Sequence, residues 1–136
     1  MDPLFAPAHA HLGRIYVDAG MYDEAIAELE IAADLAGGVT HSGYLGQAYA
    51  KADRTDDAMR ELERLTEFSK QHDVPAFKFS LIHAGLGEKE QAFKLLEKAY
   101  ENREFPMAIL NVAEVLDSLR DDPRFDDLLR RIGLEP

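Results

Sequence analysis

The stretch HLGRIYVDAGMYDEAIAELEIA, His11 to Ala32, decides the fold because its apolar residues keep a helical spacing on both sides of a break. Gly20 stands at the break and can adopt the positive φ that closes a helix. Asp23 and Glu24 follow it, and acidic residues suit the first turn of a new helix. The stretch therefore predicts two helices joined by a tight turn.

The same pattern returns twice along the chain, at offsets of 33 and then 34 residues. The stretches YLGQAYAKADRTDDAMRELERL (44–65) and KFSLIHAGLGEKEQAFKLLEKA (78–99) align with the first without a gap. Small residues at a helix crossing set the distance between the two axes. A helical unit of about 34 residues that repeats is typical of a solenoid. Two columns hold small residues, namely Ala25, Ala58 and Ala92 in one and Gly13, Gly46 and Ser80 in the other.

These columns resemble the tetratricopeptide repeat family, whose pattern runs Leu-Gly-x-x-Tyr, then Gly, Ala, an aromatic or Leu, and Ala. The second unit departs from it at Asp53, where Gly is usual, and the third at Ser80 and His83. The first unit matches at Leu12, Gly13, Tyr16, Gly20, Ala25, Leu29 and Ala32.

The resemblance implies an all-α fold, a right-handed helical solenoid of three helix-turn-helix units. The expected units cover about residues 6–38, 39–71 and 73–104 of a single domain. Residues 105–136 lack the repeat columns and are expected to form C-terminal capping helices, because a solenoid needs an end piece to shield its last repeat.

Two capping helices are predicted. The first begins at Pro106, and the second runs from Pro123 to Ile132 with Asp122 as its N-cap. The inner stripe of the second is expected to be Phe125, Leu128, Leu129 and Ile132. This tail is similar to the C-terminal repeat region of bacterial multidomain regulators, which implies a regulatory attachment.

The N-terminus predicts a fragment, because units of this family commonly finish in Asp-Pro and the chain begins Met1-Asp2-Pro3. The alternative is a natural start in which Pro3 opens a helix. A cut at this point leaves one flank of the first helix without a neighbour, with Leu4, Phe5 and Ile15 exposed.

Composition excludes several classes of partner. The chain carries 15 Lys and Arg against 26 Asp and Glu, a formal net charge of −11. Binding to nucleic acid needs a basic stripe, and anionic membranes also select basic surfaces. No apolar run approaches the ~20 residues of a membrane span. We therefore expect a cytoplasmic protein with protein or peptide partners, no nucleic acid and no membrane insertion.

The sequence gives no support for catalysis, a cofactor or a metal. It has no cysteine, and no two of its five histidines have the i, i+4 spacing of a helical metal site. His83 occupies a tyrosine column, which favours a packed side chain. Five carboxylates are interpreted as solvated helix faces, namely Glu24, Glu28, Glu61, Glu63 and Glu97.

The resemblance implies a concave groove lined by the first helix of each unit. Only Lys78 matches the cationic clamp with which some members hold acidic chaperone tails, so that ligand is not expected. Phe77 and Leu81 form an apolar wall in this interpretation; the alternative is that both pack against neighbouring helices. The predicted groove residues are Ala10, Arg14, Val17, Gln47, Lys51, Phe77, Lys78 and Leu81.

The sequence thus favours a non-catalytic interaction module that binds a peptide or partner domain in its groove. The alternative is a structural or oligomerisation segment of a larger bacterial regulator. In that role the N-terminal flank stacks on an upstream repeat or on a second copy in a homodimer.

Overall fold

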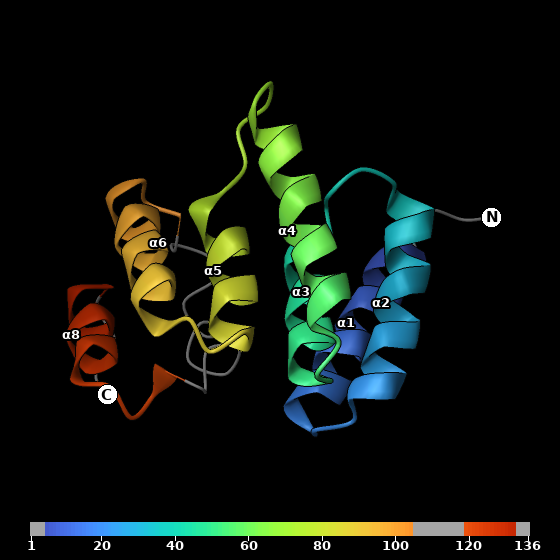
Figure 1. Cartoon of the computed structure of the whole chain (residues 1–136), viewed down its shortest axis with the longest axis horizontal. Helices are drawn as coiled ribbons and strands as arrows, with labels where there is room; N and C mark the ends of the chain where they lie inside the picture. The colour runs from blue at the N-terminus through green and yellow to red at the C-terminus, as the bar shows by residue number, and fades with distance from the viewer. Residues whose placement is uncertain (1–4, 105–118, 133–136) are drawn as a thin grey trace.

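The computed structural model describes residues 5–104 and 119–132, and every regular element in these ranges is an α-helix (Figure 1). None of these helices is long and apolar enough to cross a membrane. The all-α prediction is therefore confirmed. The helices are α1 (Phe5–Asp18), α2 (Tyr22–Ala36), α3 (Ser42–Lys51), α4 (Thr55–Ser69), α5 (Ala76–Gly85), α6 (Lys89–Glu101) and α8 (Pro123–Ile132).

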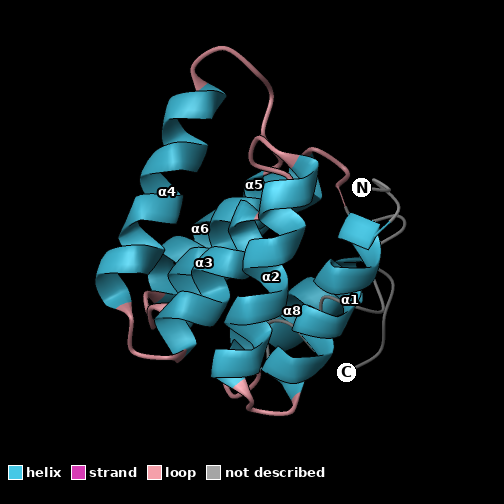
Figure 2. Ribbon diagram, turned by 90° about the vertical axis from the view of Figure 1, so that its right-hand side faces the viewer, coloured by secondary structure: helices cyan, strands magenta, loops and turns pink. Residues whose placement is uncertain are grey.

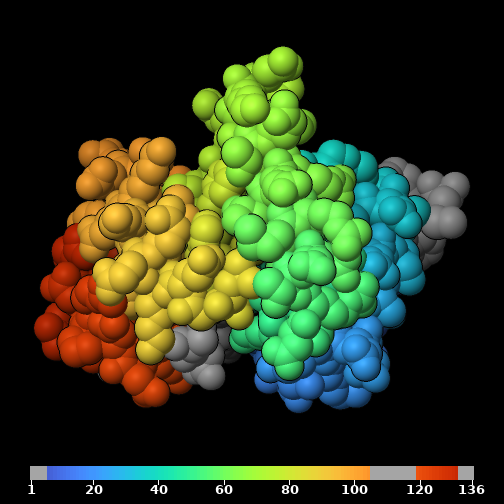
Figure 3. Space-filling view, in the orientation of Figure 1, coloured from blue at the N-terminus to red at the C-terminus, as the bar shows by residue number. Residues whose placement is uncertain are grey.

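The first six helices form three successive pairs, α1/α2, α3/α4 and α5/α6, in which the two partners lie side by side (Figures 1 and 2). Between pairs, α2 lies against α3 and α3 lies against α5, while α8 packs on α6 at the far end. The C-terminal end of α4 and the loop after it stand out from the surface (Figure 3). The right-handed twist of the array stays a prediction.

One geometry closes all three pairs. The turn residue has a positive φ in each case, 78° at Gly20, 63° at Asp53 and 79° at Gly87. The next N–H donates to the carbonyl five residues back, at 2.8, 2.8 and 2.9 Å respectively. This bond belongs to the Schellman motif that ends many helices. Aspartate tolerates the left-handed region better than most residues, so Asp53 keeps the turn although glycine is usual there.

The small residues lie where neighbouring helices approach most closely. A Cβ placed on Gly13 would lie 2.6 Å from Leu29 Cγ, and one on Gly46 would lie 2.6 Å from Ile82 Cγ1. Neither position has room for a larger side chain. The alanine column has no exposed surface at Ala25, Ala58 and Ala92.

The final helix confirms the second predicted cap. Asp122 Oδ1 accepts the backbone N–H of Arg124 at 3.0 Å, as an N-cap residue does. The inner face is buried at Phe125, Leu128 and Leu129. The predicted helix from Pro106 and the side chain of Ile132 lie outside the described residues.

Two arginines of α8 hold it against α6. Arg124 pairs with Glu90 at 2.8 Å and lies 4.4 Å from the ring centre of Phe93. Arg131 binds Glu97 and lies 5.2 Å from the ring centre of Tyr100. An ion pair at each end of α8 therefore holds its apolar face against α6.

One carboxylate contradicts the interpretation of the acidic residues as solvated. Glu61 is buried and pairs with Arg64 at 3.2 Å. Its Cβ lies 3.3 Å from where a Cβ on Gly46 would stand, so the glycine lets α3 cover the stem of this side chain. Of the other four, Glu28 and Glu97 are half-buried in contacts with His9 and Arg131. Glu24 and Glu63 are exposed.

Candidate peptide-binding groove

The predicted groove residues lie on α1, α3 and α5, the first helix of each pair. Of these, α3 and α5 approach one another most closely. A Cβ on Gly43 would lie 3.1 Å from the carbonyl oxygen of Lys78, and one on Gly85 would lie 3.1 Å from Ala50 Cβ. Glycine at these two positions therefore sets the distance between the helices.

A pocket of about 370 Å³ lies where α3 and α5 begin. We call it the α3–α5 pocket. Its exposed lining is mainly apolar, and Phe77 and Tyr44 supply aromatic surface. It brings together three predicted groove residues, Phe77, Lys78 and Leu81. The full lining is Thr40, Gly43, Tyr44, Pro75, Phe77, Lys78, Leu81 and Glu104.

Lys78 is the cation of this pocket. Its Nζ donates to the backbone carbonyl of Thr40 at 3.2 Å, which joins α5 to the loop before α3. Burial lowers the pKa of Lys78. Burial also lowers the pKa of His41, and the positive charge of Lys78 adds to that shift. Lys78 in the pocket lining and His41 just before α3 are thus close enough for one charge to affect the other.

Glu104 was not predicted as a groove residue. Its carboxylate accepts the backbone N–H groups of Ala76 and Phe77, both at 3.0 Å, and so caps the start of α5. The residue at the N-cap position is Pro75, which offers no side-chain acceptor. That missing cap is a signal in the sequence, but nothing local identifies a partner 27 or 28 residues away.

Arg14 connects α1 to the same region. Its guanidinium carbon lies 4.7 Å from the ring centre of Tyr44, in cation–π geometry. Burial raises the pKa of Tyr44, and the charge of Arg14 opposes that shift. The Nε of Arg14 is buried and has no hydrogen-bond partner among the described residues.

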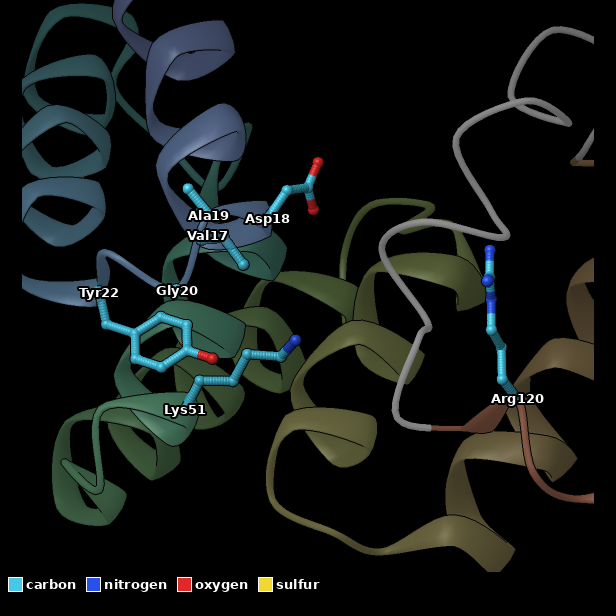
Figure 4. Close-up of a pocket in the computed structure, with 7 residues that line it drawn as sticks. All are labelled: Val17, Asp18, Ala19, Gly20, Tyr22, Lys51 and Arg120. Atoms are coloured by element: carbon cyan, nitrogen blue, oxygen red, sulfur yellow. The ribbon is translucent and has the colours of Figure 1, made fainter.

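A second pocket, of about 470 Å³, lies at the opposite ends of α1 and α3. We call it the α1–α3 pocket. Tyr22 and Lys51 lie side by side on one wall, and Arg120 stands on the far side (Figure 4). It contains the predicted residues Val17 and Lys51. The full lining is Val17, Asp18, Ala19, Gly20, Tyr22, Lys51 and Arg120.

Half of the predicted groove residues offer little or no surface. Leu81 is fully buried, and its Cδ1 lies 3.3 Å from where a Cβ on Gly43 would stand. Leu81 therefore packs against α3, which was the alternative to a ligand-facing wall. Ala10, Val17 and Gln47 are also buried. The partly exposed members are Arg14, Lys51, Phe77 and Lys78.

The described residues hold no group of three or more His, Asp or Glu side chains placed to bind a metal. His83 is partly buried, as a residue of the tyrosine column should be, and its Nδ1 lies 2.8 Å from Glu88 Oε1. His9 lies against Glu28 on the neighbouring helix. These histidines are engaged in single pairs.

Comparison with known proteins gives one match, to the tetratricopeptide repeat model over residues 6–37. No curated protein and no solved structure matches the chain. The matched segment is the α1/α2 pair, and a repeat of this kind indicates a module for protein–protein interaction. Residues 6–37 are therefore identified as a tetratricopeptide repeat.

Proposed function

We propose that this protein is a non-catalytic module that binds a peptide or a segment of a partner protein across α1, α3 and α5. The α3–α5 pocket carries the proposal, because it is mainly apolar and lies among residues expected in the groove. Pockets of this kind hold the side chain that anchors a bound segment.

The polar groups around the pocket suit the backbone of such a segment. Lys78 is fixed at the rim by its bond to Thr40, and Arg14 lies over Tyr44. A cation held in place loses less side-chain entropy on binding than a free one. Phe77 is the anchor that we expect to contribute most, because aromatic residues dominate the binding energy of interfaces.

Peptide selection tests the proposal. A random peptide library is panned on the full chain, and the affinity of the enriched peptides is measured for wild type and for Phe77→Ala. We expect about a tenfold loss of affinity, since loss of an aromatic anchor commonly costs more than 1 kcal/mol. Phe68→Ala is the matched control, because Phe68 is an exposed aromatic residue on α4, outside this pocket.

Circular dichroism of both variants separates loss of binding from loss of folding. Equal affinity of the enriched peptides for wild type and a folded Phe77→Ala protein would remove the α3–α5 pocket from consideration.

A second candidate role is stacking through the flank of the first pair. The exposure of Leu12 and Ile15 on α1 favours it. This role uses a different surface from the groove, so one protein can have both.

A further inference from the structure

We propose that one face of α1 is a docking surface for a further helix-turn-helix unit of the same repeat type. We call this face the α1 flank and define it by Ala8, Leu12, Ile15 and Ala19, which are all exposed. They lie three or four positions apart and so form one stripe along the helix. In Figure 2, α1 lies at the edge of the array with α2 beside it. This inference does not depend on the groove.

Leu12 and Ile15 have an exposure that their repeat columns do not show elsewhere. Leu12 is 37% exposed and Ile15 is 48% exposed. One unit further on, Leu45 and Ala48 occupy the same columns and are buried, at 3% and 0%. These two columns are therefore covered by neighbouring helices in the second unit, and they are uncovered in the first.

The third pair repeats the burial. Ile82 follows Ile15 and Ala48 in its column and has no exposed surface. It packs against Gly46 on the first helix of the preceding pair, beside the stem of Glu61 on the second. Both helices of the preceding pair thus cover Ile82, and the small residue Gly46 lies opposite its branched side chain.

The neighbouring column adds a polar requirement. Tyr49 donates its hydroxyl to Glu30 on α2, the second helix of the preceding pair, at 2.5 Å. Tyr16 takes the place of Tyr49 in the first pair, and its hydroxyl has no hydrogen-bond partner among the described residues. The docked unit should therefore offer a small residue opposite Ile15 and a carboxylate opposite Tyr16.

A second copy of the chain does not meet these requirements end to end. In such an arrangement α1 would be covered by α6 of the copy, which is the second helix of its last pair. Its outer face is already occupied by α8, which is fastened through Glu90 and Glu97. We therefore assign the α1 flank to a unit other than a copy of this chain.

The test supplies such a unit in register. In the full chain, residues 5–37 are duplicated directly ahead of Phe5, which reproduces the offset of 33 residues between the first two units. The added α2 then stands where the natural α2 stands on α3. Because repeat stability is a sum of unit and interface contributions, we expect the midpoint of thermal unfolding to rise by about 5 °C in one cooperative transition.

Substitutions in the inner copy identify the surface. Leu12→Glu with Ile15→Glu should abolish the rise, because both charges would be buried. Ile31→Glu should preserve it. Ile31 is 42% exposed in the same unit, and the equivalent residues of the other two units, Arg64 and Lys98, are exposed as well. A neighbouring unit therefore does not cover this column. A separate, earlier unfolding step for the added unit would overturn the proposal, as would a rise that survives the double substitution.

Sedimentation of the unmodified chain tests the choice of occupant. We expect the unmodified chain to be a monomer. The double substitution Leu12→Glu with Ile15→Glu should leave both its mass and its melting midpoint unchanged. A dimer that this substitution dissociates would show that a second copy occupies the flank, and the proposal would be wrong. Binding of the selected groove peptides should be the same for wild type and this variant, so failure here is distinguishable from failure of the groove.

Discussion

The junction between the first two pairs, where α3 meets α1 and α2, differs from the junction between the second and third pairs, where α5 meets α3. Both junctions use the same repeat columns. At the second junction, Gly85 lies against Ala50 and Gln47. At the first, Lys51 occupies the column of Gly85, and Val17 occupies that of Ala50. Bulky residues in these columns leave the α1–α3 pocket open, whereas glycine lets α3 and α5 close on one another.

The polar contacts follow the same division. The first junction is bridged by long side chains, from Arg14 to Tyr44 and from Tyr49 to Glu30. The second relies on glycine, with Lys78 bound to a backbone carbonyl at its rim. A repeat can therefore keep its helices and turns while one or two columns decide how tightly adjacent units pack.

The largest effect is expected from giving the second junction the residue of the first. Gly85→Lys should destabilise the fold by roughly 1–3 kcal/mol, because its Cβ would press on Ala50 and on the backbone of Gln47. Urea unfolding measures the change. Lys51→Ala is the control at the equivalent position and should shift stability by less than about 0.5 kcal/mol. Equal effects of the two substitutions would contradict the comparison.

Removal of one hydroxyl probes the first junction. Tyr49→Phe should cost about 1–2 kcal/mol, since it removes the hydrogen bond from the buried Tyr49 to the carboxylate of Glu30. Tyr16→Phe changes the same column in the first pair, where the hydroxyl bonds to no described residue, so it should be close to neutral. Thermal unfolding of both variants decides the matter, and a matching loss in Tyr16→Phe would show that the hydroxyl acts within its own pair.

A smaller contribution is expected from the contact of Arg14 with Tyr44. A double-mutant cycle with Arg14→Ala and Tyr44→Leu should give a coupling energy of about 0.5–1 kcal/mol. Arg14→Lys should retain only part of it, because a lysine does not stack on the ring as a planar guanidinium does. Additive single effects in the cycle would mean that the two side chains are merely close.

The smallest effect concerns pH at the second junction. Burial and the charge of Lys78 lower the pKa of His41 in the folded state, so the unfolded chain binds this proton more readily. Stability should therefore fall as pH drops from the unfolded pKa of about 6.5 to the lower folded pKa. His41→Gln should show a shallower decline of the urea midpoint between pH 8 and pH 5. An unchanged slope would exclude His41 as its source.

Much of the fold follows from the sequence because it depends on local patterns. Helical spacing, the turn glycines and the alanine column predict the pairs, and Asp122 with Pro123 predicts α8. Asp53 shows that one column can change residue and keep its conformation, since aspartate accepts a positive φ of 63°. Each of these features depends on residues that lie within one repeat of each other in the sequence.

The candidate site was less predictable, because family positions do not report the distance between helices. The repeat pattern places Leu81 in the groove wall, yet Gly43 lets α3 pack over it and bury it. The sequence likewise predicts a solvated Glu61, and the glycine at position 46 allows its burial in the same way. In both cases the decisive residue lies on another helix and has no side chain of its own.

The shared turn of the three pairs has a consequence for the order of folding. Each Schellman bond joins residues only five positions apart, so closing it costs little chain entropy. Every hairpin can nucleate alone and early, and the rate of folding should depend on docking between hairpins. Gly85 lies at the tightest of these docking steps. A larger residue there should slow the late phase of refolding and leave the early helical phase unchanged.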